Sequence, residues 1–277
     1  MKQKKLLIVL VLYKTQLDES TSYLSLKKNA DKLSVEYDLL IYNNYLKITI
    51  ENSEDYTVVN AGTNGMLAGA YNFALNKASN ENIEWLLLLD QDTEITSAYI
   101  EELSSFLNNP KSGEISAAVP VLKFNDIILS PKRIDNKHWK HHNLEKKKSY
   151  QGEKTFAFNS LTLIKTDFLR EIGGFSVDFP LDYLDYWYYY KLYEANKAIY
   201  VFDVELSHEL SLFDYQKTIS LERHKNLLSA EKRFICNYLG KSYQPSYRFS
   251  LLKRFIYQLI FYKNKAYAKI TWSTLTT

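Results

Sequence analysis

Four short apolar runs, separated by polar stretches, constrain the fold of this chain more than any other feature of its sequence. Helix-like spacing of apolar residues fills the first gap, at Ser20–Leu33, and the last gap, at Gly65–Ala78. The alternation predicts an α/β fold with a mainly parallel sheet flanked by helices on both faces. The runs, each as long as a strand buried on both faces, are Leu6–Leu12, Tyr37–Tyr42, Tyr56–Val59 and Trp85–Leu89.

The pattern in the second half of the chain is less regular. We expect a polar loop over Ile127–Gln151, an aromatic-rich helix over Leu181–Tyr193, and helices throughout residues 215–277. A further helix start is expected at Thr166-Asp167. The remaining strands are expected at Ala117–Phe124, Phe156–Ile164 and Ala198–Val204.

Composition excludes several classes of protein. A chain of 277 residues with 46% hydrophobic content can bury a large core, which excludes a disordered protein. The single cysteine, Cys236, excludes a disulfide scaffold and a multi-thiolate zinc site. The N-terminal apolar run, Leu6–Tyr13, is too short to cross a bilayer. We therefore expect neither a signal peptide nor a transmembrane protein.

The net charge of +3 hides an uneven distribution. The last acidic residue is Glu231, and the 46 residues after it contain nine Lys or Arg. Residues 1–231 hold the other 26 basic residues against all 32 acidic ones. An acidic body with a basic tail is not the pattern of a uniformly basic nucleic-acid binder, so we expect no nucleic-acid partner.

Two carboxylates follow the fourth strand, in the sequence Asp90-Gln91-Asp92. Ligands of such sheets bind beyond the carboxyl ends of the strands. Residues two apart on an extended chain point the same way, so Asp90 and Asp92 face one site, and their oxygens suit Mg²⁺ or Mn²⁺. The alternative is a helix cap, because Asp92-Thr93 precedes the helical pattern of Ser97–Leu107.

Five parts of the sequence form an ordered set: Leu6–Tyr13, Asn60–Asn72 (NAGTNGMLAGAYN), Leu86–Asp92 (LLLLDQD), Asp182–Lys191 (DYLDYWYYYK) and His208. This set resembles the family 2 glycosyltransferases of the GT-A fold, and among them the bacterial rhamnosyltransferase-like branch. The resemblance covers about residues 5–235. It implies a Rossmann-like GT-A catalytic domain over residues 1–235, with a nucleotide-binding half at about 1–110 and an acceptor half at about 111–235. Residues 236–277 remain as a basic, amphipathic helical tail.

The resemblance also implies roles for five residues. Asp92 and His208 resemble the ligands of the divalent ion, and Asp90 resembles the acid that contacts the nucleotide. Asp185, or second to it Asp182, resembles the base that deprotonates the acceptor hydroxyl. Spacing of three residues puts these two on one helix face. The alternative is that one of them caps the helix.

The loops after the first three strands are expected to hold the nucleotide. Tyr13 offers a ring for stacking on a pyrimidine. Asn43-Asn44 stands where the family usually has an acid, which obscures the identity of the base. A late cation, Arg223, is suited to the departing diphosphate, although a surface role is equally compatible with the sequence. The other expected nucleotide-sugar contacts, all in the loop after the third strand, are Asn60, Gly62 and Asn64.

The tail has the pattern of a basic amphipathic helix over Arg248–Lys263. Such a helix suits the surface of an anionic membrane. The alternative is packing on the catalytic domain or on a second subunit. The apolar face would consist of Leu252, Phe255, Ile256 and Leu259.

Together these features predict an inverting, metal-dependent hexosyl- or rhamnosyltransferase. It would use Mn²⁺ or Mg²⁺ to move a sugar from a UDP- or dTDP-sugar to a glycan or lipid-linked acceptor. By resemblance, the product would be a bacterial surface or capsular polysaccharide, and the enzyme would be cytoplasmic, at the inner face of the membrane if the tail binds there. A homo-oligomer is compatible with the sequence. The alternatives are a catalytically inactive nucleotide-sugar-binding protein on the same fold and a nucleotidyltransferase.

Overall fold

The computed structural model describes residues 6–134, 141–208 and 219–277. The chain forms two compact units, of which the first comprises residues up to Arg133 together with Asn143–His208. The second comprises Ile134–His142 and all residues after His208. The boundary expected at residue 235 lies inside this second unit, and the predicted helical residues 215–218 lie outside the described ones.

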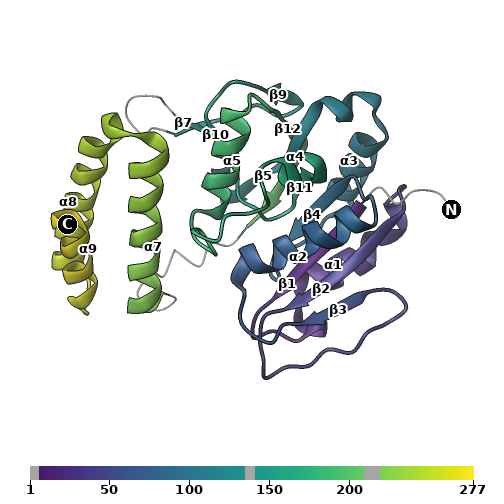
Figure 1. The fold of residues 1–277 in the computed structure, drawn as a ribbon, viewed down its shortest axis with the longest axis horizontal. Coiled ribbons are helices and arrows are strands. Elements are labelled where there is room, and N and C mark those ends of the chain that lie inside the picture. The colour runs from purple at the N-terminus through teal and green to yellow at the C-terminus, as the bar shows by residue number, and fades with distance from the viewer. Residues whose placement is uncertain (1–5, 135–140, 209–218) are drawn as a thin grey trace. The chain divides into compact units, whose positions relative to one another are not determined.

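A nine-stranded mixed sheet forms the centre of the first unit (Figure 1). β1 pairs in parallel with β2 on one side and with β4 on the other, and β12 pairs in parallel with β5. β11 runs antiparallel between β4 and β5. In order across the sheet the strands are β3 (Thr57–Asn60), β2 (Tyr37–Asn43), β1 (Leu6–Leu12), β4 (Trp85–Leu89), β11 (Thr162–Lys165), β5 (Ile115–Phe124), β12 (Ala198–Ser207) and β9 (Lys148–Tyr150), with β6 (Ile127–Ser130) beside β5.

The four predicted N-terminal strands are confirmed, and so are the helices between them. The helices are α1 (Thr21–Asn29), α2 (Met66–Asn80) and, after β4, α3 (Ser97–Asn108). The Ser20 hydroxyl accepts a hydrogen bond from the Tyr23 amide at the start of α1. The short helices η1 (Leu17–Glu19), η2 (Ala30–Lys32) and η3 (Pro110–Glu114) occupy connections.

Alternate residues of β1 point to opposite sides of the sheet, and helices cover both sides. Leu6, Ile8, Leu10 and Leu12 belong to one buried cluster with Tyr99, Ile100 and Leu103 of α3. α2 packs on β1 and β4, and its residues are absent from that cluster, so it covers the other face. Complete burial of β1 and β4 explains why both read as continuous apolar runs.

Two expectations for the second half were wrong. Residues 127–151 were expected to form a loop, but β6, β7 (Lys132–Ile134), β8 (His141–Asn143) and β9 lie there. The turn that starts this region has Asn125 at φ 51°, a conformation that Asn tolerates and that links β5 to β6. The strand expected over Phe156–Ile164 is instead split into β10 (Thr155–Phe156) and β11.

The split between β10 and β11 has a local cause. Leu161 adopts φ 58°, which no strand residue adopts. The Thr162 amide donates to the Asn159 carbonyl at 3.1 Å, and the Thr162 hydroxyl donates to the Phe158 carbonyl at 2.7 Å. These bonds close a turn immediately before β11. The helices that follow are α4 (Thr166–Glu171) and the aromatic-rich α5 (Leu184–Glu194).

The second unit is helical over its described residues 219–277. α7 (Leu221–Phe234) continues into a π-helical turn, η4 (Ile235–Leu239), and then η5 (Lys241–Tyr243), α8 (Gln244–Phe261) and α9 (Ala266–Thr276) follow. α9 packs against both α7 and α8. Among the described residues, no helix combines the length and the apolar character needed to cross a membrane.

Candidate active site at the carboxyl edge of the sheet

The sheet topology brings three separated segments to one edge. β4 ends at Leu89, directly before Asp90. β11 runs antiparallel to β4, with Thr162 opposite Leu88, so Ser160, two residues before this strand, lies beside the end of β4. β12 runs parallel to β5 and ends directly before His208, whose amide donates to the Lys123 carbonyl at 2.8 Å.

Asp90 is a half-buried carboxylate at this edge. Burial, together with the neighbouring charge of Asp92, raises the pKa of Asp90 to about 7. A hydrogen bond from Ser160 partly opposes this rise of the Asp90 pKa. Asp90 therefore takes up and releases a proton near neutral pH, and a cation or a hydroxyl beside it would favour the ionised form.

Asp92 and His208 are close enough to interact electrostatically. Burial lowers the pKa of His208, and the charge of Asp92 partly offsets this, so the imidazole is neutral near pH 7. The Thr93 hydroxyl lies 3.1 Å from His208 Nδ1, the kind of second contact that orients a metal-binding histidine. A neutral imidazole and a carboxylate fit a divalent ion that takes its other ligands from phosphate oxygens. Within the described residues, no three His, Cys, Asp or Glu side chains converge as a complete protein cage.

The alternative that Asp92-Thr93 caps the next helix is wrong. The N-cap of α3 is Thr96, whose side chain accepts a hydrogen bond from the Tyr99 amide. The Thr93 hydroxyl contacts Ser160 Oγ at 2.8 Å as well as His208. Asp92 itself is exposed to solvent, where a carboxylate stays available to a ligand.

Asp185 lies in the first turn of α5 and is half-buried. Burial raises the pKa of Asp185 to about 7, with further contributions from the charges of Asp182 and Asp90. The Tyr186 amide donates to Asp185 Oδ1 at 2.8 Å and lowers this pKa in part. The N-cap of α5 is Tyr183, whose side chain makes no capping hydrogen bond. Asp185 and Asp90 thus share one electrostatic environment.

Tyr71 of α2 is a member of this cluster that sequence reasoning missed. It is fully buried, and its hydroxyl has no hydrogen-bond partner within the described residues. Burial raises the pKa of Tyr71 well above its usual value, and the charges of Asp90 and Asp185 add to the rise. Thr93 and Ser160 were also missed as site residues. The burial of a polar side chain is the signal they share, and it is visible only in the fold.

The asparagines expected to hold the nucleotide make hydrogen bonds within the protein. Asn43 Nδ2 donates to the Ile48 carbonyl at 2.6 Å and to Asn60 Oδ1 at 2.9 Å. Asn44 Oδ1 accepts a hydrogen bond from the Gly65 amide at 3.1 Å, and Asn44 Nδ2 donates to the Met66 carbonyl at 3.1 Å. Asn43 and Asn44 are 1% and 3% exposed. These bonds hold the loops after β2 and β3 together.

The remaining predicted nucleotide contacts are more open. Tyr13 is 43% exposed, its amide donates to Gln91 Oε1 at 2.8 Å, and its ring meets Tyr45 edge-on at 5.7 Å. Gly62 and Asn64 are exposed in the loop after β3. Arg223 belongs to α7 of the second unit, so it is not among the residues that the first unit brings together.

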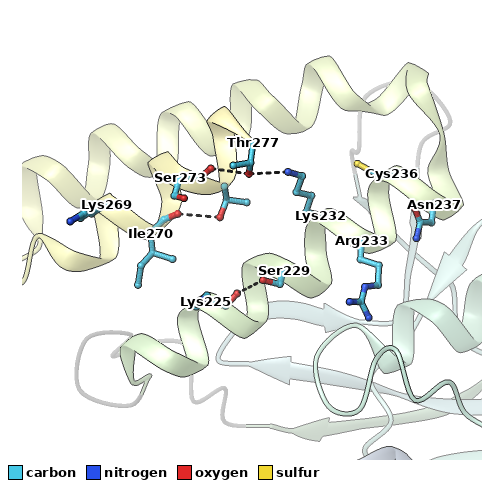
Figure 2. Close-up of a pocket in the computed structure, with 11 residues that line it drawn as sticks. Lys225, Ser229, Lys232, Arg233, Cys236, Asn237, Lys269, Ile270, Ser273 and Thr277 are labelled. Carbon is cyan, nitrogen blue, oxygen red and sulfur yellow. Dashed lines mark hydrogen bonds between the residues drawn. The ribbon is translucent and has the colours of Figure 1, made fainter.

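A groove of about 680 Å³ lies within the second unit, between α7 and α9 (Figure 2). No Asp or Glu lines it, and none of the carboxylates at the sheet edge contributes to it. All of its lining residues belong to the second unit. The lining residues are Lys225, Ser229, Lys232, Arg233, Cys236, Asn237, Lys269, Ile270, Ser273, Thr274 and Thr277.

Comparison with known proteins shows the family of the chain. Residues 34–173, just over half of the chain, match the family described as glycosyl transferase family 2. The chain belongs to this family. No curated protein sequence matches this family 2 transferase. The narrower resemblance to a rhamnosyltransferase-like branch has no specific support.

Solved structures resemble this family 2 transferase in fold. The mannosyltransferase PcManGT from Pyrobaculum calidifontis, in complex with GDP-Man and Mn²⁺, is 14% identical over 99% of this chain and 74% of its own, with a TM-score of 0.54. TarS 1–349 from S. aureus is 12% identical over 97% of this chain and 90% of its own, with a TM-score of 0.49. The fold is that of the GT-A glycosyltransferases, a large, mainly parallel sheet flanked by helices.

Proposed function

We propose that this protein is an inverting glycosyltransferase that moves a sugar from a nucleotide diphosphate to an acceptor hydroxyl. The observation that carries the proposal is the gathering of Asp90, Asp92, Asp185 and His208 at one edge of a family 2 fold. The wider assignment of residues 1–235 to catalysis, with the nucleotide at about 1–110 and the acceptor at about 111–235, belongs to the same proposal.

Asp185 acts as the general base in this proposal. Its carboxylate takes the proton of the acceptor hydroxyl as the oxygen bonds to C1 of the sugar, and the bond from C1 to the diphosphate breaks on the opposite side. Because burial raises the pKa of Asp185 to about 7, the carboxylate is both ionised and basic enough near neutral pH. Asp182, whose charge contributes to that raised pKa, is the second candidate.

Asp92 and His208 would hold Mn²⁺ or Mg²⁺ with the help of donor phosphates. Bound there, the ion would act as a Lewis acid that stabilises the leaving diphosphate. Thr93 orients the His208 ring through their 3.1 Å contact. Asp90 would bind the nucleotide, and Tyr13, which is exposed at the end of β1, would stack on its base. Asn43, Asn44 and Asn60 would shape this pocket through the loops that they hold.

The donor in this proposal is a UDP- or dTDP-sugar, and the complex of PcManGT with GDP-Man adds GDP-sugars to the candidates. The acceptor is a glycan or a lipid-linked oligosaccharide of a bacterial surface or capsular polysaccharide. A self-associated form of the enzyme is compatible with the proposal. The competing proposal is a nucleotide-sugar-binding protein without catalysis. It is favoured by the sequence Trp187–Lys191 (WYYYK), which departs from the acidic helix that the chain otherwise resembles: an acid and an aromatic often follow there in the family, and Lys191 stands where Arg is usual.

The deciding experiment incubates the protein with Mn²⁺ and a panel of UDP-, dTDP- and GDP-sugars and measures release of the nucleotide diphosphate. We expect release from at least one donor, and its loss in Asp92→Asn and Asp185→Asn. Binding without release would support the non-catalytic alternative. Full activity of both variants would refute the assigned residues but not the reaction class.

A further inference from the structure

α8 exposes a continuous apolar surface. Its large side chains at positions 249, 252, 256, 259 and 260 share one side of the helix, because a turn takes 3.6 residues. Between 37% and 61% of each side chain is exposed. Grouped apolar exposure of this kind marks an interaction surface, unlike single scattered residues. We call it the α8 apolar face, and it consists of Phe249, Leu252, Ile256, Leu259 and Ile260.

The opposite side of α8 packs within the second unit. Tyr247, Leu251 and Gln258 are 8%, 1% and 2% exposed, and Gln258 Oε1 accepts a hydrogen bond from the Thr271 hydroxyl of α9 at 2.6 Å. The helix is therefore already held on one side, and the α8 apolar face is additional to that packing. Phe255, which the sequence analysis expected on this face, instead packs against Trp272, with 4.9 Å between the ring centres.

The surroundings of the α8 apolar face are cationic. Arg248 and Lys253 lie on the helix and Lys263 and Lys265 just beyond it, and no acidic residue follows Glu231. The Arg254 guanidinium donates hydrogen bonds to both carboxylate oxygens of Glu231, at 2.9 and 3.1 Å. The Lys253 ammonium lies 4.4 Å from the centre of the Phe249 ring, so its aliphatic stem borders the apolar side chains while the charge stays at their edge.

We propose that the α8 apolar face docks on the surface of an anionic lipid bilayer. The apolar side chains would enter the boundary between headgroups and acyl chains while the flanking cations meet lipid phosphates. A second copy of this chain fits less well, because two such faces would bring like charges together with no Asp or Glu in residues 232–277 to pair with them. The charged residues within α8 favour a helix lying on the bilayer rather than through it.

Flotation of the full chain with lipid vesicles tests the proposal. One set of vesicles contains phosphatidylglycerol and phosphatidylcholine in equal parts, and the other contains phosphatidylcholine alone. We compare the wild-type protein with Ile256→Glu/Ile260→Glu and with Asn226→Glu/Ser229→Glu. The control adds the same charge at exposed positions of α7, away from the α8 apolar face.

We expect the wild type and the control to float with the anionic vesicles, less at high salt and less with phosphatidylcholine alone. Binding of Ile256→Glu/Ile260→Glu should fall at least about tenfold. Unchanged helical circular dichroism would show that this loss is not unfolding. Equal binding of both double variants, or no binding by the wild type, would overturn the proposal. A wild-type dimer that becomes monomeric in Ile256→Glu/Ile260→Glu and never binds vesicles would also overturn it, in favour of a second copy.

Flotation does not depend on catalysis. Release of nucleotide diphosphate with a water-soluble acceptor should be equal in the wild type and in Ile256→Glu/Ile260→Glu. An inactive wild type that still floats would refute the proposed reaction and leave the docking surface standing.

Discussion

Thr93 Oγ1 lies 3.1 Å from His208 Nδ1 and 2.8 Å from Ser160 Oγ, so one buried hydroxyl joins the segments that follow β4 and β12 to the segment that precedes β11. The contact between Thr93 and His208 links residues 115 positions apart in the sequence. It fixes the orientation of the one imidazole that the proposal assigns to the metal.

Replacing Thr93 tests that link. Thr93→Val keeps the shape of the side chain and removes the hydroxyl that orients His208. We expect the Mn²⁺ concentration for half-maximal activity to rise about ten- to a hundredfold. Thr93→Ser keeps the hydroxyl and should stay close to the wild type. Equal Mn²⁺ dependence in all three proteins would show that the contact does not serve metal binding.

The pH dependence of catalysis identifies the base. If Asp185 must be ionised, kcat/KM falls below about pH 7, the pKa that burial gives Asp185. The charge of Asp182 raises this pKa, so Asp182→Asn should remain active and shift the acidic limb of the pH profile to lower pH. A profile of kcat/KM against pH for both proteins measures the shift. An inactive Asp182→Asn protein that retains its fold would make Asp182 the base instead.

Local sequence patterns predict which residues follow β4 at the carboxyl edge of the sheet. They do not predict which residues other strands bring to that edge. Continuous apolar runs mark β1 and β4, so the position of Asp90 and Asp92 is predictable. Ser160 arrives beside them because β11 is inserted antiparallel between β4 and β5. The pairing of β11 with β4 depends on contacts across more than 70 residues, and the periodicity of a strand of four residues does not encode it.

The two asparagines at the end of β2 illustrate a different limit of prediction from sequence. A polar pair at a strand end suggests a ligand contact, yet Asn43 and Asn44 are buried and hydrogen-bonded to loop backbone. Asn suits both tasks because its side chain donates and accepts. Only the partners distinguish a loop-bracing asparagine from one that reads a nucleotide.

Stability of the ligand-free protein should fall as pH rises. Burial raises the pKa of Asp90 and of Asp185 to about 7 in the folded protein, whereas aspartates of an unfolded chain titrate near about 4. Between these values the folded state holds more protons, so the free energy of unfolding decreases with rising pH. Urea denaturation at pH 5 and pH 8 measures this decrease, which should be smaller in Asp90→Asn/Asp185→Asn.

The matched control for this experiment is Asp126→Asn, which neutralises an exposed carboxylate and should leave the decrease as it is in the wild type. An identical pH dependence in Asp90→Asn/Asp185→Asn would mean that these two carboxyls are solvated in solution.

The turn before α5 depends on Gly174. Asn72 of α2 holds this turn by donating to the Phe175 carbonyl at 2.9 Å and accepting from the Phe175 amide at 2.7 Å. Gly174 has φ +86°, and a Cβ there would lie 2.6 Å from Asn72 Oδ1. We expect Gly174→Ala to cost about 2–4 kcal/mol of unfolding free energy, from backbone strain and the displaced Asn72.

Gly173→Ala is the control for this position. It has a similar φ of +82° but nothing within 4 Å of an added Cβ, so only the backbone strain of about 1–2 kcal/mol remains. Urea denaturation compares the two variants. Equal losses would show that the contact with Asn72 contributes nothing beyond the conformation.

Removal of the Tyr71 hydroxyl tests whether this group has a structural or a functional role at the carboxyl edge. It is buried without a hydrogen-bond partner among the described residues, and an unsatisfied polar group in this setting costs stability. Tyr71→Phe keeps the ring contact with Phe175, whose centre lies 5.3 Å away. We therefore expect the free energy of unfolding to stay within about 1 kcal/mol of the wild type or to rise.

Activity should respond differently. If the Tyr71 hydroxyl donates to the donor sugar or to an ionised Asp90 or Asp185 during the reaction, kcat/KM of Tyr71→Phe falls about ten- to a hundredfold, the equivalent of one hydrogen bond to a charged group. Steady-state kinetics with the donor identified in the panel measures this. Tyr99→Phe supplies the contrast, because the buried Tyr99 hydroxyl donates to the Leu161 carbonyl at 2.7 Å, so its loss should lower stability. If Tyr71→Phe had the kinetics of the wild type, the Tyr71 hydroxyl would have no part in the reaction.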